Sequence, residues 1–523
     1  MAYTFYFEKL GVWHLAKDIA KYVYKLTEAL PDSEKYGLQS QMRRAAVSIA
    51  SNIAEGTSRK SYRDQAHFTQ LAYSSLMELF NQFLLAKELG FLSNASEEEF
   101  RRKVEELANK LNSLRNSQLN RVSEPETPYG NPSNPLPTDV GIESSNPQIL
   151  DSSSVQMVDL ASQYQRLKPE IDEAIQRVLE SSRYIKGPEV EAFEEELANY
   201  LGVNHVIGCA NGTDALQIAL MALGLKPGDE VIVPSFTYVA TAEVIGLLGL
   251  TPIMVDVDPG TFNLTAEFVE KAITPKTKAV VPVHLFGQSA DMEPILAIAK
   301  KHGLFVVEDN AQAIGAEYTF SDGSIKKTGT MGHVGTTSFF PSKNLGCYGD
   351  GGAIFTNDEE LADRLRMIAN HGQKKRYYHD TIGVNSRLDT IQAAILLVKL
   401  KYLNDYNAAR QKAAAYYDTA FKDINWLQIP VRQPNSTHVF HQYTLKVKNG
   451  RRDDLAEHLK SEGIPFGVYY PVPLYKQKAF APYYKGNELT VTEQLCREVI
   501  SLPIHTEMNE ELLQMITAAV SQF

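Results

Sequence analysis

Apolar residues recur every three to four positions through the first 116 residues, which is the period of an amphipathic helix. In the first segment Trp13, Ala16, Ile19, Val23 and Leu26 follow this period. The pattern predicts further helices at about 37–53, at 64–89 and after residue 96. Because four antiparallel helices with short loops form a bundle, we expect residues 1–117 to be a four-helix bundle.

The pattern is lost over residues 118–154, which are rich in proline, serine, asparagine and glycine. A segment of this composition buries too little apolar surface to offset the entropy of ordering. We expect it to be a disordered linker that tethers the bundle to the rest of the chain.

From residue 155 short apolar runs alternate with amphipathic helices. The runs lack the alternation of a half-exposed strand, as expected for strands that are covered on both faces. The pattern therefore predicts an α/β fold over 155–400, with a mostly parallel central sheet and helices on both faces, followed by a smaller α+β domain over 401–523. The predicted strands lie at about 230–233, 251–255, 279–283, 305–308, 336–340 and 352–356, and one long helix is predicted at 390–417.

The composition of the chain limits the kinds of partner and cellular location that we expect for the protein. The first 120 residues are nearly neutral, with 16 Lys and Arg against 14 Asp and Glu, so the rest of the chain carries a net charge of −13. An acidic main body argues against nucleic acid as the substrate of that part of the chain, and nucleic acid is not an expected partner of the protein. No run of 18 apolar residues is present, so we expect no membrane span, and the start of the chain does not resemble a signal peptide. Three scattered cysteines favour a reducing compartment, the cytoplasm.

Lys343 and Asp309 carry the most informative chemistry. Lys343 stands between an apolar run and a glycine-rich turn, and Asp309 ends another apolar run 34 residues earlier. An acid at the carboxyl end of a strand faces the ligand crevice of an α/β sheet. A desolvated lysine condenses with an aldehyde, and a carboxylate keeps a pyridine nitrogen protonated, which together indicate pyridoxal phosphate (PLP). The alternative is a surface lysine beside a flexible loop.

A phosphate site is predicted at the start of the helix near residue 215. Gly212 and Thr213 would offer free N–H groups and a hydroxyl there, and Ser338 would be a second donor. The alternative for Gly212 and Thr213 is an ordinary helix cap, and for Ser338 a capped strand end.

Six motifs then occur in order over residues 155–523. In this order and spacing they resemble the DegT/DnrJ/EryC1/StrS family of PLP-dependent nucleotide-sugar aminotransferases. The family implies a PLP-dependent transferase fold of type I. The motifs are 211–216 (NGTDAL), 234–241 (PSFTYVAT), 282–288 (PVHLFGQ), 308–312 (EDNAQ), 338–346 (SFFPSKNLG) and 383–389 (GVNSRLD).

The resemblance implies roles for individual residues. Lys343 would hold the cofactor covalently and shuttle the proton in transamination, and Asp309 would pair with the pyridine nitrogen. Gln312 would bind the ring hydroxyl, and Tyr238 would stack on the ring unless it is a core tyrosine. Asn385 would contact the cofactor phosphate of a neighbouring subunit, which implies a homodimer with shared active sites.

Substrate contacts are also implied by the resemblance. Arg387 either binds a substrate carboxylate or pairs with Asp389, and the sequence favours neither. Tyr469 and Tyr470 stand where family members often carry His-Tyr, so Tyr469 is a departure that bears on sugar specificity.

Residues 374–379 form a basic and aromatic loop that would suit the diphosphate and uracil of a UDP-sugar. The alternative is a run of charged residues on a solvent-exposed face. The candidate substrate-binding residues of this loop are Lys375, Arg376 and His379.

The expected reaction is the transfer of an amino group from L-glutamate to the keto carbon of a nucleotide sugar, with no metal. Residues 209–218, 347–358 and 371–373 resemble the family branch that acts at C3 of UDP-2-acetamido-2-deoxy-3-oxo-glucuronate for bacterial O-antigen synthesis. An aminotransferase for a dTDP-3-oxo-6-deoxyhexose is the first alternative.

The second alternative is an assembly or RNA-binding scaffold, because residues 7–116 resemble the four helix bundle protein family of 23S rRNA intervening sequences. That family implies higher oligomers.

Overall fold

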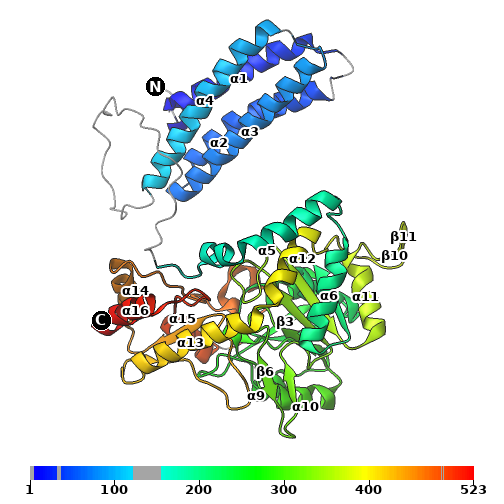
Figure 1. The fold of residues 1–523 in the computed structure, drawn as a ribbon, viewed down its shortest axis with the longest axis vertical. Coiled ribbons are helices and arrows are strands. Elements are labelled where there is room, and N and C mark those ends of the chain that lie inside the picture. The colour runs from blue at the N-terminus through cyan, green and yellow to red at the C-terminus, as the bar shows by residue number, and fades with distance from the viewer. Residues whose placement is uncertain are drawn as a thin grey trace. The chain divides into compact units, whose positions relative to one another are not determined.

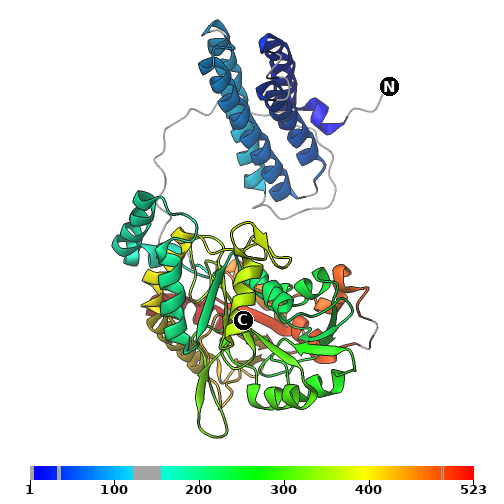
Figure 2. The same ribbon diagram turned by 90° about the vertical axis from the view of Figure 1, so that its right-hand side faces the viewer.

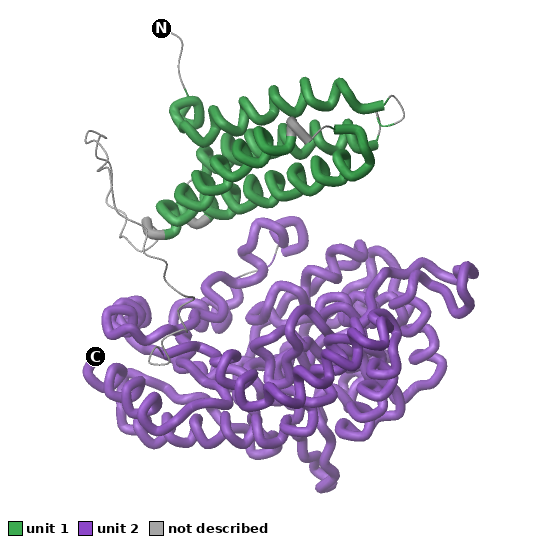
Figure 3. The backbone as a smooth tube through the Cα atoms, turned by 45° about the horizontal axis from the view of Figure 1, so that its top comes forward, with its two compact units in different colours: residues 1–144 green, residues 145–523 purple. Residues whose placement is uncertain are grey.

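The computed structural model describes residues 5–31, 34, 37–59, 61–92, 94–121, 155–484, 486 and 488–523. The chain has two compact units, residues 1–144 and 145–523 (Figure 3). The linker predicted at 118–154 lies outside the described residues from 122 onward, and its first four residues belong to a helix. No helix in these ranges is long and apolar enough to cross a membrane.

The first unit is a bundle of four helices packed side by side (Figure 1). Its core comes from the periodic apolar positions, as Val12, Ala16, Ile19 and Val23 of the first helix are all buried. Ser61 caps the third helix by accepting the Asp64 N–H at 3.0 Å. The helices are α1 (Gly11–Leu26), α2 (Leu38–Thr57), α3 (Tyr62–Glu88) and α4 (Asn94–Arg121).

The second unit is built around a seven-stranded sheet of order β1-β9-β8-β5-β4-β2-β3. Strands β8, β5, β4, β2 and β3 are parallel to one another, and β9 runs antiparallel to both of its neighbours. The predicted α/β class with a mostly parallel sheet is confirmed. The strands are β1 (His205–Cys209), β2 (Glu230–Pro234), β3 (Thr251–Val255), β4 (Thr277–Val280), β5 (Phe305–Asp309), β8 (Val334–Ser338) and β9 (Gly352–Thr356).

Helices cover both faces of this sheet, which explains the uninterrupted apolar runs (Figure 2). Val231 and Val233 of β2 pack with α7, α8 and α11 on one face, whereas Ile232 packs with α9 and α10 on the other. Helices α5, α6 and α12 pack together, with α6 against β1. The bounds are α5 (Leu160–Ser181), α6 (Pro188–Leu201), α7 (Gly212–Ala222), α8 (Ala240–Leu247), α9 (Ala266–Ala272), α10 (Met292–His302), α11 (Glu359–Ala369) and α12 (Thr390–Leu400).

The C-terminal part has its own three-stranded sheet, of order β12-β13-β14, and its own apolar core. The domain boundary predicted at residue 400 lies inside the second unit and stays a prediction. Two hairpins, β6-β7 and β10-β11, project from the second unit. The remaining elements are β6 (Glu317–Thr319), β7 (Ile325–Lys327), β10 (Gln373–Lys375), β11 (Tyr378–His379), α13 (Leu403–Phe421), β12 (Leu427–Gln428), β13 (Tyr443–Val447), α14 (Arg452–Ser461), α15 (Thr490–Glu498), β14 (Val499–Leu502) and α16 (Glu510–Gln522).

The single long helix predicted at 390–417 is wrong, because the chain breaks between α12 and α13 at Lys401–Tyr402. Apolar positions continue across the break, so periodicity alone does not reveal it. Strand β14 was also missed, because it begins directly where α15 ends and its four residues are too few to show a pattern of their own.

Candidate active site

Lys343 lies in the turn that follows β8, where its backbone N–H donates to the Phe340 carbonyl at 2.8 Å. The surrounding protein removes the amine from water and lowers its pKa to about 8, while the negative charge of Asp309 opposes this shift. The sequence-predicted pair is therefore close enough to interact electrostatically. A lysine with this pKa is largely a free amine at mildly alkaline pH, so it is a competent nucleophile and base.

Asp309 ends β5 and its side chain is buried. Its carboxylate accepts the Thr241 hydroxyl at 2.8 Å and the Ala311 N–H at 3.1 Å. Thr241 belongs to a motif that the sequence singled out, but sequence reasoning gave it no role. Two donors hold the carboxylate in one orientation at the carboxyl end of the sheet.

Gln312, Tyr470 and Tyr238 lie together beside Asp309. The Gln312 Nε2 donates to the Tyr470 hydroxyl at 3.1 Å, and the rings of Tyr470 and Tyr238 are 6.3 Å apart. Burial, with the Asp309 charge as a further cause, raises the pKa of Tyr470 well above its usual value. Tyr238 is 58% exposed, which rules out the alternative of a core tyrosine and leaves its ring free to contact a ligand.

The residues of the predicted phosphate site lie together. Gly212 and Thr213 begin α7, whose cap Asn211 accepts the Asp214 N–H at 2.8 Å. A Cβ atom built on Gly212 would lie 2.7 Å from the Ser338 Cβ, so only glycine lets the helix start come this close to the end of β8. The N-terminus of α7 and the Ser338 hydroxyl therefore lie close together, where both could donate to one phosphate.

Tyr469 does not lie in the open site as Tyr238 does. Its partly buried ring packs against the apolar cluster around Phe236 and Phe286. Gly467 makes this possible, because a Cβ there would lie 2.4 Å from the Tyr469 ring. Tyr469 therefore packs on this cluster beside Tyr470, with the two ring centroids 6.2 Å apart, a position that the sequence did not reveal.

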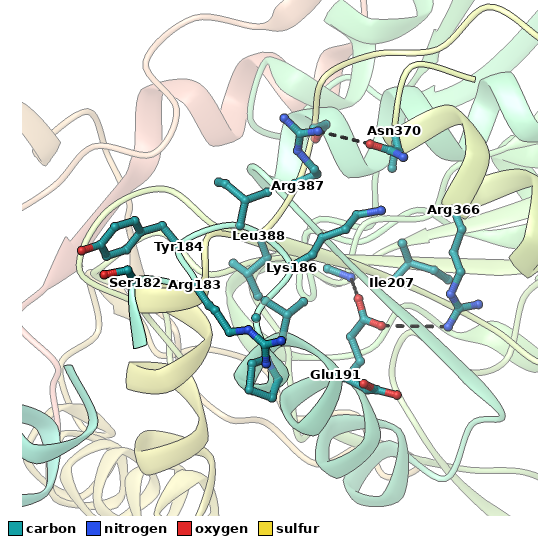
Figure 4. A pocket seen from close by; sticks show the side chains of 18 residues that line it. Ser182, Arg183, Tyr184, Lys186, Glu191, Ile207, Arg366, Asn370, Arg387 and Leu388 are labelled. Atoms are coloured by element: carbon teal, nitrogen blue, oxygen red, sulfur yellow. Dashed lines mark hydrogen bonds and ion pairs between the residues drawn. The ribbon is translucent and has the colours of Figure 1, made fainter. Parts of the chain in front are cut away.

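Arg387 lies in a second place, a pocket of about 890 Å³ between the 182–188 loop, β1, the end of α11 and residues 386–388 (Figure 4). Its Nη1 donates to the Asn370 Oδ1 at 3.2 Å, and no ion pair with Asp389 joins these two described residues. The pocket is lined by more cationic than anionic side chains. They are Arg183, Lys186, Arg366 and Arg387 against Glu191 and Glu194.

The other predicted residues are not brought to Lys343 within one chain. Asn385 is exposed and forms a backbone bridge to Asn370. Lys375 and Arg376 lie over the rings of their neighbours in the β10-β11 hairpin, and His379 Nδ1 lies 2.8 Å from the His371 carbonyl oxygen. Among the described residues, no hydrogen bond or ion pair joins these side chains to Lys343 or Asp309.

Comparison with known proteins identifies the family to which these site residues belong. Residues 165–521 match the model of the DegT/DnrJ/EryC1/StrS aminotransferase family, and residues 8–113 match the 23S rRNA-intervening sequence protein model. The chain belongs to the DegT/DnrJ/EryC1/StrS aminotransferase family. Both resemblances found in the sequence are thereby confirmed.

Members of the family that resemble this chain act on different sugars. The UDP-2-acetamido-2-deoxy-3-oxo-D-glucuronate aminotransferase of Pseudomonas aeruginosa is 50% identical over 367 residues, which are 70% of this chain and 99% of that protein. The dTDP-3-amino-3,4,6-trideoxy-alpha-D-glucose transaminase of Streptomyces venezuelae is 42% identical and covers 71% of this chain and 97% of its own length. The S. venezuelae DesV structure in complex with a ketimine intermediate has a TM-score of 0.68 and 43% identity, and covers 71% of this chain and 98% of its own.

The protein is thus a nucleotide-sugar aminotransferase whose cofactor is pyridoxal phosphate. The residues around Lys343 fit this cofactor. The carboxyl ends of β2, β5 and β8 bring together four groups that this cofactor needs. They are a nucleophilic amine, a buried carboxylate, an exposed aromatic ring and a helix that begins at a glycine.

The lowered pKa of Lys343 predicts how cofactor attachment depends on pH. Only the free amine reacts, so in cofactor-free protein the rate of attachment should rise with pH and reach half its maximum near pH 8. Stopped-flow absorbance after addition of pyridoxal phosphate measures this rate. A midpoint near the ordinary lysine value of 10.5 would contradict the assigned environment.

Proposed function

We propose that this protein transfers the amino group of L-glutamate to C3 of UDP-2-acetamido-2-deoxy-3-oxo-glucuronate, for bacterial surface polysaccharide such as O-antigen. The observation that carries the substrate assignment is the cationic pocket around Arg387, together with 50% identity to the P. aeruginosa protein of that activity. A uronate carries a carboxylate beyond its diphosphate, and a 6-deoxyhexose does not.

Lys343 and Asp309 are the proposed catalytic residues. The cofactor, when bound, supplies an electron sink that stabilises negative charge at the carbon losing its proton. Lys343 would hold the cofactor and then, as a free amine, take and return that proton at Nζ. Asp309, fixed by Thr241 and the Ala311 N–H, would keep a proton on the pyridine nitrogen.

The proposed cofactor-binding residues would contact different parts of the cofactor. Gly212, Thr213 and Ser338 would bind the phosphate at the start of α7. Tyr238 would stack on the ring, and Gln312 would donate to its hydroxyl oxygen. These assignments rest on the close approach of Gly212 to Ser338, the exposure of Tyr238 and the orientation of the Gln312 amide.

We propose a homodimer because Asn385 does not reach Lys343 within its own chain. Asn385 of the partner subunit would complete the phosphate site, which explains why this polar side chain is exposed in a single chain. The bundle of residues 8–113 could add a higher order of assembly, and the cytoplasmic location stays a prediction.

Arg387 of the partner subunit, two residues from Asn385, would hold the sugar through its carboxylate, with Tyr469 and Tyr470 as walls of the site. Lys375, Arg376 and His379 on the exposed hairpin would meet the diphosphate and uracil. Supporting this, the guanidinium of Arg387 makes one hydrogen bond within the described part of the chain, from Nη1 to Asn370, and its other donors remain available there for a carboxylate.

The substrate assignment is tested by incubating purified protein and pyridoxal phosphate with glutamate and the 3-oxo UDP uronate. Mass spectrometry then follows 2-oxoglutarate and the aminated sugar. The proposal expects both products in equal amounts. Amination of a dTDP-3-oxo-6-deoxyhexose in preference to the uronate would instead support the alternative substrate.

Replacing Arg387 with methionine should reduce kcat/KM for the uronate about a hundredfold, the effect of losing a charge-assisted bidentate contact. The same change should alter kcat/KM for a 6-deoxy analogue by no more than about threefold. Steady-state kinetics with both sugars measure the difference. Arg177→Met, which removes an exposed arginine paired with Glu173 on α5, is the matched control, and equal losses on both sugars would contradict the carboxylate contact.

A further inference from the structure

A buried histidine and a buried glutamate face each other behind the candidate site. The His284 Nε2 lies 2.8 Å from the Glu308 Oε2, and both side chains are fully buried. The other ring nitrogen, Nδ1, accepts the Ala290 N–H at 3.1 Å. The proton of a neutral ring is therefore on Nε2, which donates to Glu308 and fixes the ring in one tautomer.

Glu308 is anchored by more than His284. Its carboxylate also accepts the backbone N–H groups of Gly329 at 2.8 Å, Met331 at 2.6 Å and Gly332 at 2.5 Å. Four donors on two oxygens match the acceptor capacity of an ionised carboxylate. The His284 ring is thus hydrogen-bonded to a carboxylate whose position is fixed by the backbone of residues 329–332.

The segment that begins at His284 reaches the site through its backbone. The His284 N–H donates to the Asp309 carbonyl at 3.1 Å, and two residues later the Phe286 N–H donates to the Gln312 Oε1 at 2.7 Å. Phe286 has a φ of +58°, a conformation that a phenylalanine rarely adopts and that surrounding contacts must hold. With Oε1 occupied, the Gln312 amide turns its N–H₂ toward Tyr470 and the site.

We propose that His284, held by Glu308, is a positioning residue that acts through the Phe286 backbone to fix which end of the Gln312 amide faces the cofactor. This inference rests on the proposed role of Gln312 as a donor to the ring oxygen of the cofactor. It adds a role for two residues that contact neither cofactor nor substrate. The Tyr470 hydroxyl accepts from Gln312, so its own proton stays available for donation within the site.

The test compares His284→Leu with Gln312→Leu in two measurements. Calorimetry on cofactor-free protein gives the Kd for pyridoxal phosphate, and the absorption spectrum of the cofactor-loaded protein over a pH series gives the pH midpoint of the visible band. Both variants should weaken cofactor binding about tenfold, the equivalent of one hydrogen bond. Both should raise the pH midpoint, because a ring oxygen that loses its donor holds the neighbouring proton more tightly.

The double variant separates positioning from general destabilisation. If His284 acts through Gln312, adding His284→Leu to Gln312→Leu should not raise the midpoint further. His333→Leu is the matched control, since His333 Nδ1 accepts the Val306 N–H at 3.0 Å near the other end of β5. It should leave the midpoint unchanged even if it lowers the melting temperature.

Several outcomes would overturn the inference. A raised midpoint in Gln312→Leu with a normal one in folded His284→Leu would remove the positioning role and leave the proposed function intact. An unchanged midpoint in Gln312→Leu would remove the role of Gln312 itself. If His284→Leu does not fold, His284→Gln, which keeps a donor and an acceptor without the ring geometry, must show a smaller shift in the same direction.

Discussion

Replacing Lys343 with alanine will eliminate covalent cofactor attachment and reduce transamination about ten-thousandfold or more, the upper range for loss of a positioned proton-transfer group. The reason is that Lys343 would supply both the nucleophile and the base. Its amine is the lowered-pKa lysine that lies within electrostatic reach of Asp309. Turnover with glutamate and the absorption spectrum of the purified variant measure the two losses.

A matched control separates this role from the general effect of removing a desolvated lysine. Burial also lowers the pKa of Lys446, whose Nζ donates to the Pro259 carbonyl at 3.0 Å. Lys446→Ala should retain the visible band of the bound cofactor. If Lys343→Ala retains the band as well, Lys343 is not the attachment point.

Replacing Asp309 with asparagine will reduce turnover about a thousandfold, because an amide cannot hold a proton on the pyridine nitrogen as a carboxylate does. The substitution has a second, independent consequence. The Asp309 charge raises the pKa of Lys343 against the effect of burial, so its removal should move the pH midpoint of cofactor attachment below about 8. Stopped-flow absorbance over a pH series measures this shift.

Asp256→Asn is the control for losing a buried carboxylate. Asp256 accepts the Val491 and Thr492 N–H groups at 2.9 and 2.7 Å, and it follows β3. This variant should lower the melting temperature without a thousandfold loss of turnover. An Asp309→Asn variant with near-normal turnover would contradict the assignment of Asp309.

Sequence reasoning predicted those parts of the candidate site that lie at the ends of strands. Lys343 and Asp309 stand where apolar runs stop, and the carboxyl ends of neighbouring parallel strands meet at one edge of a sheet. Gly212 and Ser338 could be predicted as candidates for the same reason, since a helix start and a strand end carry local sequence signals.

The remaining contacts could not be predicted because they depend on tertiary geometry. Glu308 binds three backbone N–H groups of the loop at 329–332, and any residue type could supply those donors. The Phe286 N–H contacts Gln312 from a segment 26 residues away in the sequence, and Phe286 takes a left-handed conformation that its residue type does not favour. The sequence left two possible partners for Arg387, a substrate carboxylate and Asp389. In the structure its Nη1 donates instead to the Asn370 side chain.

Sequence reasoning predicted six of the seven strands of the central sheet, namely β2, β3, β4, β5, β8 and β9. Strand β1 was missed because its five residues include Gly208 and lead directly into the cap of α7, which dominated the pattern. Helix α9, with seven residues, is too short for its period to be distinct.

The most direct test of the central claim is the absorption spectrum of the purified full-length protein, recorded with pyridoxal phosphate before and after the addition of glutamate alone. We expect a visible band that is lost on adding glutamate, with release of one equivalent of 2-oxoglutarate, and neither the band nor the release in Lys343→Ala. A wild-type protein that shows no visible band, or a band that glutamate leaves unchanged, would contradict the assignment of Lys343 and of glutamate as the amino donor.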